Sequence, residues 1–153
     1  MLEFSLPGEW MRGAGVWSYG ATNLVHIVGV AMLFGSVLVL DLRLLGLWRR
    51  VALAFIEIPT LPMATIGFCL AVISGFALLT TNATDYVGNP FLVIKFVAIA
   101  LGLANVAVAQ ALPAWRQRHE REGLRRGQLA VIGGVSLACW SGALGAGRMI
   151  GYW

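Results

Sequence analysis

Four long apolar segments, separated by short polar links, fill most of this 153-residue chain. They occupy residues 22–40, 62–79, 90–112 and 128–150, and each has roughly the 20 residues that an α-helix needs to cross about 30 Å of hydrocarbon. Hydrophobic residues make up 59% of the chain and charged residues only 12%. The pattern therefore predicts an all-α integral membrane protein, a single transmembrane domain built as a four-helix bundle.

Helix-stop and helix-start residues set the limits of these spans. The first span ends at Asp41-Leu42-Arg43, with Gly46 as a stop for the helix. The second is expected to begin after the break at Pro59 and Pro62, and the third begins at the helix-start signal Asn89-Pro90. These signals leave no room for a second domain.

Residues 2–19 precede the first span and do not resemble a cleavable signal, because Glu3 and Glu9 stand where a basic region is expected. The segment mixes aromatic and aliphatic residues with glycine and charge, which is typical of a helix lying flat on a membrane surface. We therefore expect a short N-terminal interfacial helix, with Trp10 and Trp17 at the depth of the lipid headgroups.

Arginines are concentrated in two of the three links between spans, and the link at residues 80–89 has no lysine or arginine. Because basic links stay in the cytoplasm, we expect a bacterial inner-membrane protein whose two termini lie on the periplasmic side. The net charge of +4 reflects this topology and does not indicate nucleic-acid binding. The arginines concerned are Arg43, Arg49, Arg50, Arg116, Arg118, Arg121, Arg125 and Arg126.

Small residues recur every four positions in two spans, a spacing that lets helix backbones approach closely. A stripe in the third span contains the polar residues Lys95 and Asn105, so it should point into the bundle or a subunit interface and not at lipid. The small residues are Gly67, Ala71 and Gly75 in the second span and Gly134, Ala138, Gly142 and Ala146 in the fourth.

Polar side chains inside the spans indicate a candidate site. His26, Lys95 and Arg148 all fall in the outer third of the membrane by helical rise, and Asn23 lies one turn before His26 on the same face. A neutral imidazole flanked by two cations predicts a pocket for a molecule with negative charge and an apolar body. A quinone, a haem with its propionates and a lipid headgroup all meet that description.

The same residues also have structural interpretations. A single histidine within a span often forms a hydrogen bond between helices, and Lys95 and Arg148 lie near enough to the interface to extend towards it. At the inner end of the first span, Asp41 and Arg43 are two positions apart and do not face each other. We therefore expect separate partners, such as a loop arginine for Asp41, and we interpret Asp41, Arg43 and Asn105 as structural.

Two strings resemble a known family. NLVHIVGVAMLFGSVLVLDLRLLG, followed after the second span by TTNATDYVGNPFLVIKFVAIALGLAN, is similar to an uncharacterised group of small four-helix bacterial inner-membrane proteins, classed as a domain of unknown function. The resemblance covers about residues 17–110 and implies a fold but no settled activity. That family has a histidine near the inner end of the third span, where this chain has Gln110. A site with two intramembrane histidines is therefore not implied.

A looser likeness links the chain to copper-resistance D-type and protoporphyrinogen-oxidase-type membrane proteins, which have a histidine early in span one and a lysine early in span three. In those groups the histidine is associated with b-type haem, so the likeness implies His26 as an axial ligand of haem iron and Lys95 near a propionate. His119, the other histidine, lies in the link after span three and across the membrane from His26. A single chain is thus not expected to form a bis-histidine site.

Three ligand arrangements remain for such a haem: a five-coordinate iron, an iron shared between two copies of His26, or a histidine–methionine pair. The candidate methionines are Met32, Met63 and Met149, of which Met32 is the poorest because it lies about 9 Å along the same helix.

Three functional classes agree with the sequence. One is a haem- or quinone-binding protein of electron transfer that uses Asn23, His26, Lys95 and Arg148. Another is an accessory subunit of a larger membrane complex or homo-oligomer, with membrane lipid as its surroundings. The third is a small transporter, which is least favoured because the chain shows no inverted repeat. The sequence also lacks CxxC, CxxCH, Walker and HExxH motifs, and Cys69 and Cys139 are interpreted as packing residues.

Overall fold

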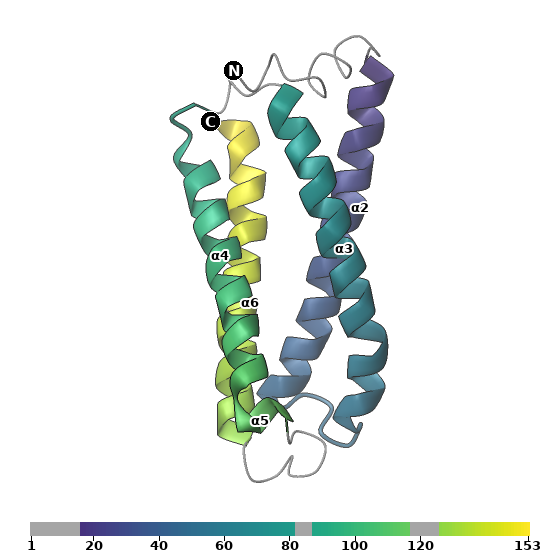
Figure 1. Ribbon diagram of the computed structural model, residues 1–153, viewed down its shortest axis with the longest axis vertical. Helices are drawn as coiled ribbons and strands as arrows, with labels where there is room; N and C mark the ends of the chain where they lie inside the picture. The colour runs from purple at the N-terminus through teal and green to yellow at the C-terminus, as the bar shows by residue number, and fades with distance from the viewer. Residues whose placement is uncertain (1–15, 82–86, 117–125) are drawn as a thin grey trace.

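A computed structural model describes residues 16–81, 87–116 and 126–153. Four long helices dominate it, and the described residues contain no strand (Figure 1). The all-α four-helix bundle predicted from the sequence is thereby confirmed. The helices are α2 (Val16–Leu45), α3 (Leu53–Thr81), α4 (Pro90–Ala111) and α6 (Arg126–Met149), with the short α5 (Pro113–Arg116) and a 3-10 turn η3 (Ile150–Tyr152).

All four long helices are long and apolar enough to cross a membrane. Many of their large hydrophobic side chains face outward, which suits a surface surrounded by lipid and not by water. The helices extend beyond the predicted spans, most of all at the start of α3 and at both ends of α2. Residues 1–15 of the expected interfacial helix lie outside the described residues, and Val16–Tyr19 belong to the first turns of α2.

The end of α2 follows the glycine stop signal. Gly46 has a φ of 111°, its N–H donates to the Arg43 carbonyl, and the Leu47 N–H donates to the Leu42 carbonyl. This pair of hydrogen bonds is the Schellman motif, in which a left-handed residue closes the last turn of a helix. The helix therefore continues to Leu45, and Asp41 and Arg43 lie within it and not after it.

The start of α3 differs from the prediction. Pro59 and Pro62 were expected to precede the second span, but both lie inside a continuous helix that begins at Leu53. Each proline removes one backbone hydrogen bond, a loss that membrane helices tolerate when other groups satisfy the freed carbonyls. The carbonyls that lose their usual donors are those of Phe55 and Ile58, four residues before each proline.

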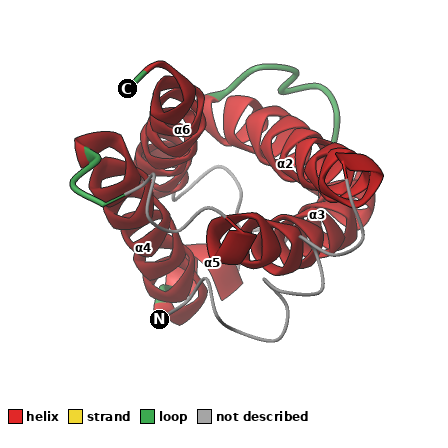
Figure 2. Cartoon of the chain, turned by 90° about the horizontal axis from the view of Figure 1, so that it is seen from above, coloured by secondary structure: helices red, strands yellow, loops and turns green. Residues whose placement is uncertain are grey.

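The four helices form an open ring (Figure 2). Within it, α2 packs against α3 and against α6, and α4 packs against α6, whereas α3 and α4 share few contacts. We call the end where α2 begins and α6 finishes the His26 end, and the opposite end, where α2 finishes and α6 begins, the Asp41 end.

Close helix approach depends on three glycines. A Cβ at Gly29 would lie 2.7 Å from the backbone nitrogen of Ala71, and one at Gly67 would lie 2.7 Å from the Gly29 carbonyl oxygen. The predicted small-residue face of the second span is therefore the α2–α3 contact. In α6 the tight position is Gly133, where a Cβ would lie 3.0 Å from the Asp41 carbonyl oxygen. The neighbouring Gly134, which was predicted to form the contact face, has only one side-chain atom within 4 Å.

The stripe predicted on the third span faces α6, as expected. Gly102 is buried against the Trp140 indole, and Asn105 donates from Nδ2 to the Ile132 carbonyl at 3.1 Å. Lys95 lies at the His26 end of the same stripe, and its chain contacts Gly147. The stripe therefore brings both of its polar residues to the inner side of α4.

Candidate functional site

His26 is held by α3 through a short chain of hydrogen bonds. The Ser74 hydroxyl donates to the Leu70 carbonyl at 2.5 Å, and its oxygen lies 3.1 Å from Nδ1 of His26. Because the hydroxyl has one proton and gives it to Leu70, Nδ1 must be the donor in the bond to Ser74. In this tautomer Nε2 of the neutral ring carries the lone pair, which can accept a proton or bind a metal.

Packing also fixes the imidazole plane. A Cβ at Gly75 would lie 2.9 Å from Cε1 of His26 and 3.2 Å from Nδ1, so the ring fills the space above this glycine. The ring further interacts with the backbone of Ala71, one turn earlier on α3. His26 is thus a preorganised group whose orientation is set almost entirely by α3.

Lys95 lies close enough to His26 for the two side chains to interact electrostatically. Its Cδ, Cε and Nζ would all lie 3.7–3.8 Å from a Cβ at Gly147, so the chain runs along a glycine of α6. Within residues 16–81, 87–116 and 126–153, Lys95 has neither a hydrogen-bond partner nor an acidic partner. The structure therefore brings together two of the predicted site residues. His26 offers a nitrogen lone pair, and Lys95 offers an ammonium group without an acidic partner among the described residues.

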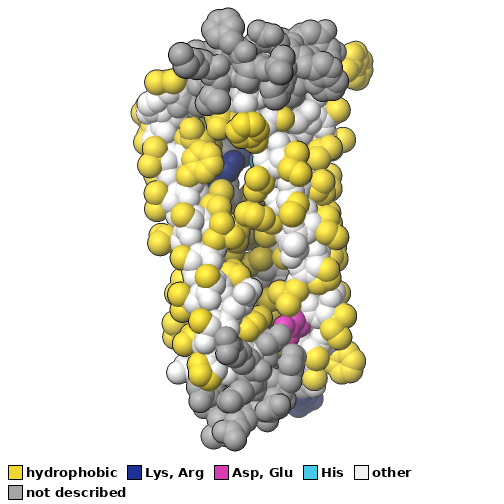
Figure 3. Space-filling view, viewed as in Figure 1, with side chains coloured by type: hydrophobic (Ala, Val, Ile, Leu, Met, Phe, Trp, Pro, Cys, Tyr) yellow, Lys and Arg dark blue, Asp and Glu magenta, His cyan; other side chains and the backbone are white. Residues whose placement is uncertain are grey.

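The two groups lie beside an opening in the bundle. Figure 3 shows the surface hollowed between α4 and α3, with a basic side chain and part of a histidine side chain visible towards the His26 end. The edges of the hollow are hydrophobic side chains. A polar recess that opens sideways between apolar walls is suited to a molecule that arrives from lipid.

A cap that was predicted from the sequence holds Lys95 at this depth. Asn89 is buried, accepts from the Phe91 N–H at 2.9 Å, and precedes Pro90 at the start of α4. Its Nδ2 also reaches the Ile150 carbonyl at 3.5 Å. The beginning of α4 is therefore tied to the end of α6, close to the Lys95–Gly147 contact.

Arg148 and Asn23 are placed differently from the other two. The Arg148 guanidinium donates to the Tyr152 hydroxyl and lies 4.7 Å above the Tyr152 ring, and both residues are exposed. Asn23 is also exposed, about 4.5 Å before His26 along α2. The described contacts of Arg148 are those of a surface residue at the His26 end, and they do not bring it to His26 or Lys95.

The methionines considered as second haem ligands do not converge on His26. Met32 lies against Gly67 in the α2–α3 contact, and Met63 and Met149 are exposed. The described part of the chain contains no group of three or more histidine, cysteine or acidic side chains that could hold a metal ion. His119 lies outside the described residues.

The residues interpreted as structural gather at the Asp41 end. Asp41 is hydrogen-bonded to Ser136 of α6, Arg43 donates from Nε to the Val51 carbonyl at 3.0 Å, and Asn105 bonds to α6 as described. Asp41 and Arg43 thus have separate partners, as their spacing predicted. Among the described residues the partner found for Asp41 is a serine hydroxyl, and three of the loop arginines considered for it, Arg118, Arg121 and Arg125, lie outside the described residues.

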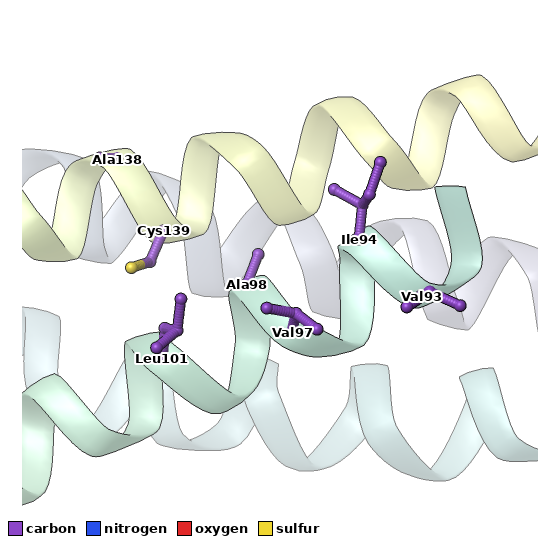
Figure 4. A pocket seen from close by; sticks show the side chains of 7 residues that line it. All are labelled: Val93, Ile94, Val97, Ala98, Leu101, Ala138 and Cys139. Carbon is purple, nitrogen blue, oxygen red and sulfur yellow. The ribbon is translucent and has the colours of Figure 1, made fainter. Parts of the chain in front are cut away.

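A groove runs between α4 and α6 (Figure 4). It has a volume of about 390 Å³ and an almost entirely apolar lining, so nothing in it can orient a polar ligand. We interpret it as a surface that contacts lipid chains. The groove exists because small side chains line part of the contact between the two helices. The lining residues are Val93, Ile94, Val97, Ala98, Leu101, Ala138 and Cys139.

Three residues position His26 and Lys95, and of these the sequence analysis missed Ser74 and Gly147 and assigned Gly75 only to helix packing. A serine in an otherwise apolar span was a usable signal for Ser74. Comparison with known proteins adds no further site residue: no family model, curated protein or solved structure matches the chain. The family resemblance stated above stays a prediction.

Proposed function

We propose that the protein binds a lipid-soluble quinone or quinol in the hollow between α3 and α4, with its polar ring held by His26 and Lys95. The observation that carries this proposal is the Ser74–His26 hydrogen bond, which leaves Nε2 of His26 as an acceptor near the Lys95 ammonium group, for which the described residues offer no acidic partner. When bound, a quinone supplies reversible two-electron redox chemistry; the protein residues bind and orient it.

The two side chains recognise opposite states of such a ring. A quinol hydroxyl donates to Nε2 of His26, and a quinone carbonyl accepts from Nζ of Lys95. Because Ser74 and Gly75 hold the imidazole in one orientation, little conformational entropy is lost when the ligand binds. A hydrogen bond to a charged group such as Lys95 contributes about 1.5–3 kcal/mol.

Access from the side supports a lipid-soluble ligand. The few contacts between α3 and α4 leave a recess with hydrophobic edges, along which an isoprenoid tail can lie while the ring reaches the polar residues. A water-soluble anion without an apolar part would gain no hydrophobic contact with these edges.

A five-coordinate haem is the second candidate. Its support is the same Nδ1 hydrogen bond, since metal-binding histidines usually donate their other ring nitrogen to a fixed acceptor. His26 fits one axial position through Nε2, and Lys95 fits a propionate. The described methionines offer no second ligand, so a six-coordinate electron-transfer haem within one chain does not fit.

Binding measurements on the purified protein in nanodiscs test the main proposal. The probes are a short-chain benzoquinone and its reduced quinol, and quenching of intrinsic tryptophan fluorescence reports their Kd. We expect His26→Phe to weaken quinol binding, and Lys95→Met to weaken quinone binding, each by roughly 10- to 100-fold. Unchanged affinity in both variants would rule out the proposed site.

Two alanine variants, Ser74→Ala and its control Thr65→Ala, distinguish a loss of His26 orientation from a general loss of stability. Ser74→Ala removes the acceptor of His26 Nδ1 and should weaken quinol binding by about 10-fold. The control is Thr65→Ala, because the exposed Thr65 hydroxyl bonds only to its own helix, at the Leu61 carbonyl. A visible spectrum of the same samples tests the haem candidate: a Soret band that is lost in His26→Ala would favour haem over quinone.

A further inference from the structure

The Asp41 carboxyl group is the most buried acidic side chain in the described part of the chain. Only 3% of the residue is exposed, and its Oδ2 is buried without a hydrogen-bond partner in residues 16–81, 87–116 and 126–153. A buried carboxylate that lacks compensating charge is strongly unfavourable, and native structures rarely keep an orphaned polar atom without a function or a bound group. The arrangement therefore points to a positively charged ligand.

Helix α6 holds this carboxyl group in place. Ser136 of α6 provides a hydroxyl to it, and the Asp41 backbone packs on Gly133 of α6, where a Cβ would lie 3.0 Å from the Asp41 carbonyl oxygen. Asn105 of α4 donates its amide nitrogen to the carbonyl of Ile132, the residue before Gly133 on α6, and its amide oxygen can act as an acceptor. Oxygen atoms of this kind are the usual ligands of hard cations.

None of the described charged side chains on the four long helices forms a hydrogen bond to Oδ2 of Asp41. On α2 the nearest is Arg43, which donates from Nε to the Val51 carbonyl. On α3 it is Glu57, a second buried carboxyl group. The charged residues of α6, Arg126 and Arg148, lie at its two ends, and α4 has only Lys95, at the His26 end.

We propose that Asp41 and Ser136 form a binding site for a small monovalent cation, either a proton or sodium, at the Asp41 end of the bundle. A small ion is favoured over a larger ligand because Asp41 is only 3% exposed and α6 packs closely on its backbone at Gly133. Asp41 supplies the negative charge and one ligand oxygen, and Ser136 supplies a second. This site is independent of the proposed quinone site, which lies about 22 Å away by the rise of α2 between positions 26 and 41.

Infrared difference spectroscopy of the full-length protein in nanodiscs tests the site without any knowledge of its activity. One series changes pH at constant ionic strength, and the other replaces choline by sodium at constant pH. We expect a carboxyl C=O signal that follows pH if the ligand is a proton, or shifted carboxylate bands with sodium if it is the metal ion. In Asp41→Asn the responsible signal should be lost.

Two further variants keep the test decisive. Glu57→Gln removes the other buried carboxyl group of the described residues and should leave the Asp41 signal in place. Ser136→Ala retains the Asp41 carboxyl group but removes its hydroxyl partner, so the signal should shift. Identical pH and sodium difference spectra for the wild type and Asp41→Asn would overturn the proposal. If Asp41→Asn does not fold, an unshifted signal in Ser136→Ala overturns it instead.

Discussion

The imidazole of His26 fills the space over Gly75, so closely that a Cβ at position 75 would lie 2.9 Å from Cε1 of the ring. The obstructing atoms belong to a side chain and not to backbone, so an added methyl group would move the ring without separating the helices. Gly75 is therefore a residue that sets the position of the imidazole, although it cannot bind any ligand itself.

This contact gives a prediction about ligand binding. We expect Gly75→Ala to shift His26 out of line with Ser74, and thereby to weaken quinol binding by about 10-fold through the loss of one aligned hydrogen bond. The unfolding midpoint should change little. Fluorescence titration and thermal melting of the same preparation measure both quantities. A variant that binds normally would show that the ring position does not depend on Gly75.

Gly29 should behave in the opposite way. Its nearest neighbour is the Ala71 backbone nitrogen, at 2.7 Å from an added Cβ, and a backbone cannot move aside. We expect Gly29→Ala to destabilise the protein by roughly 1–3 kcal/mol through overpacking. Gly35→Ala on the same helix is the matched control, because nothing lies within 4 Å of its added Cβ. Reversible unfolding in mixed micelles, followed by circular dichroism, measures the difference. Equal effects of the two substitutions would contradict the close α2–α3 approach.

Trp140 allows a test of an unpaired buried donor. The residue packs against Gly102 and makes an edge contact with the Phe68 ring, at 6.2 Å between centroids, but its Nε1–H has no hydrogen-bond partner among the described residues. An unsatisfied donor costs about 1–3 kcal/mol, which Trp140→Phe removes while keeping an aromatic ring. We expect Trp140→Phe to change stability by less than about 1 kcal/mol, and Trp140→Ala to cost about 3–5 kcal/mol. If Trp140→Phe proves as costly as Trp140→Ala, the indole N–H must have a partner.

The orientation of the helices is a prediction from the arginine distribution alone. We expect the links holding Arg49 and His119 to face the cytoplasm and the link holding Thr84 to face outward. In a background of Cys69→Ala and Cys139→Ala, a membrane-impermeant maleimide should label Thr84→Cys in intact cells. His119→Cys should be labelled only after the cells are permeabilised. The reverse pattern would invert the topology.

Much of the fold was predictable because membrane helices are encoded by length and composition. Four spans, the Asn89-Pro90 start and the Gly46 stop each depend on local chemistry, and the structure has all of them. Pro59 and Pro62 were misleading because a helix surrounded by other helices can tolerate missing backbone hydrogen bonds. A rule derived from soluble helices placed the start of α3 too late.

The candidate site was predictable in part. The depths of His26 and Lys95 followed from helical rise, and the structure places them within electrostatic reach of each other. Depth does not determine direction around the helix axis, which is why Arg148, at a similar depth, interacts with Tyr152 at the surface. The difference between Gly133 and Gly134 has the same origin, because one residue turns a helix by about 100°. Only the packing of α2 on α6 selects Gly133.

The scarcity of contacts between α3 and α4 affects how any ligand of this protein is supplied. A hollow that opens sideways is filled from the bilayer, so occupancy depends on the number of ligand molecules per lipid and not on the concentration in water. A long-tailed molecule reaches the recess by two-dimensional diffusion and never has to expose its tail. The composition of the surrounding lipid thereby becomes part of the binding equilibrium.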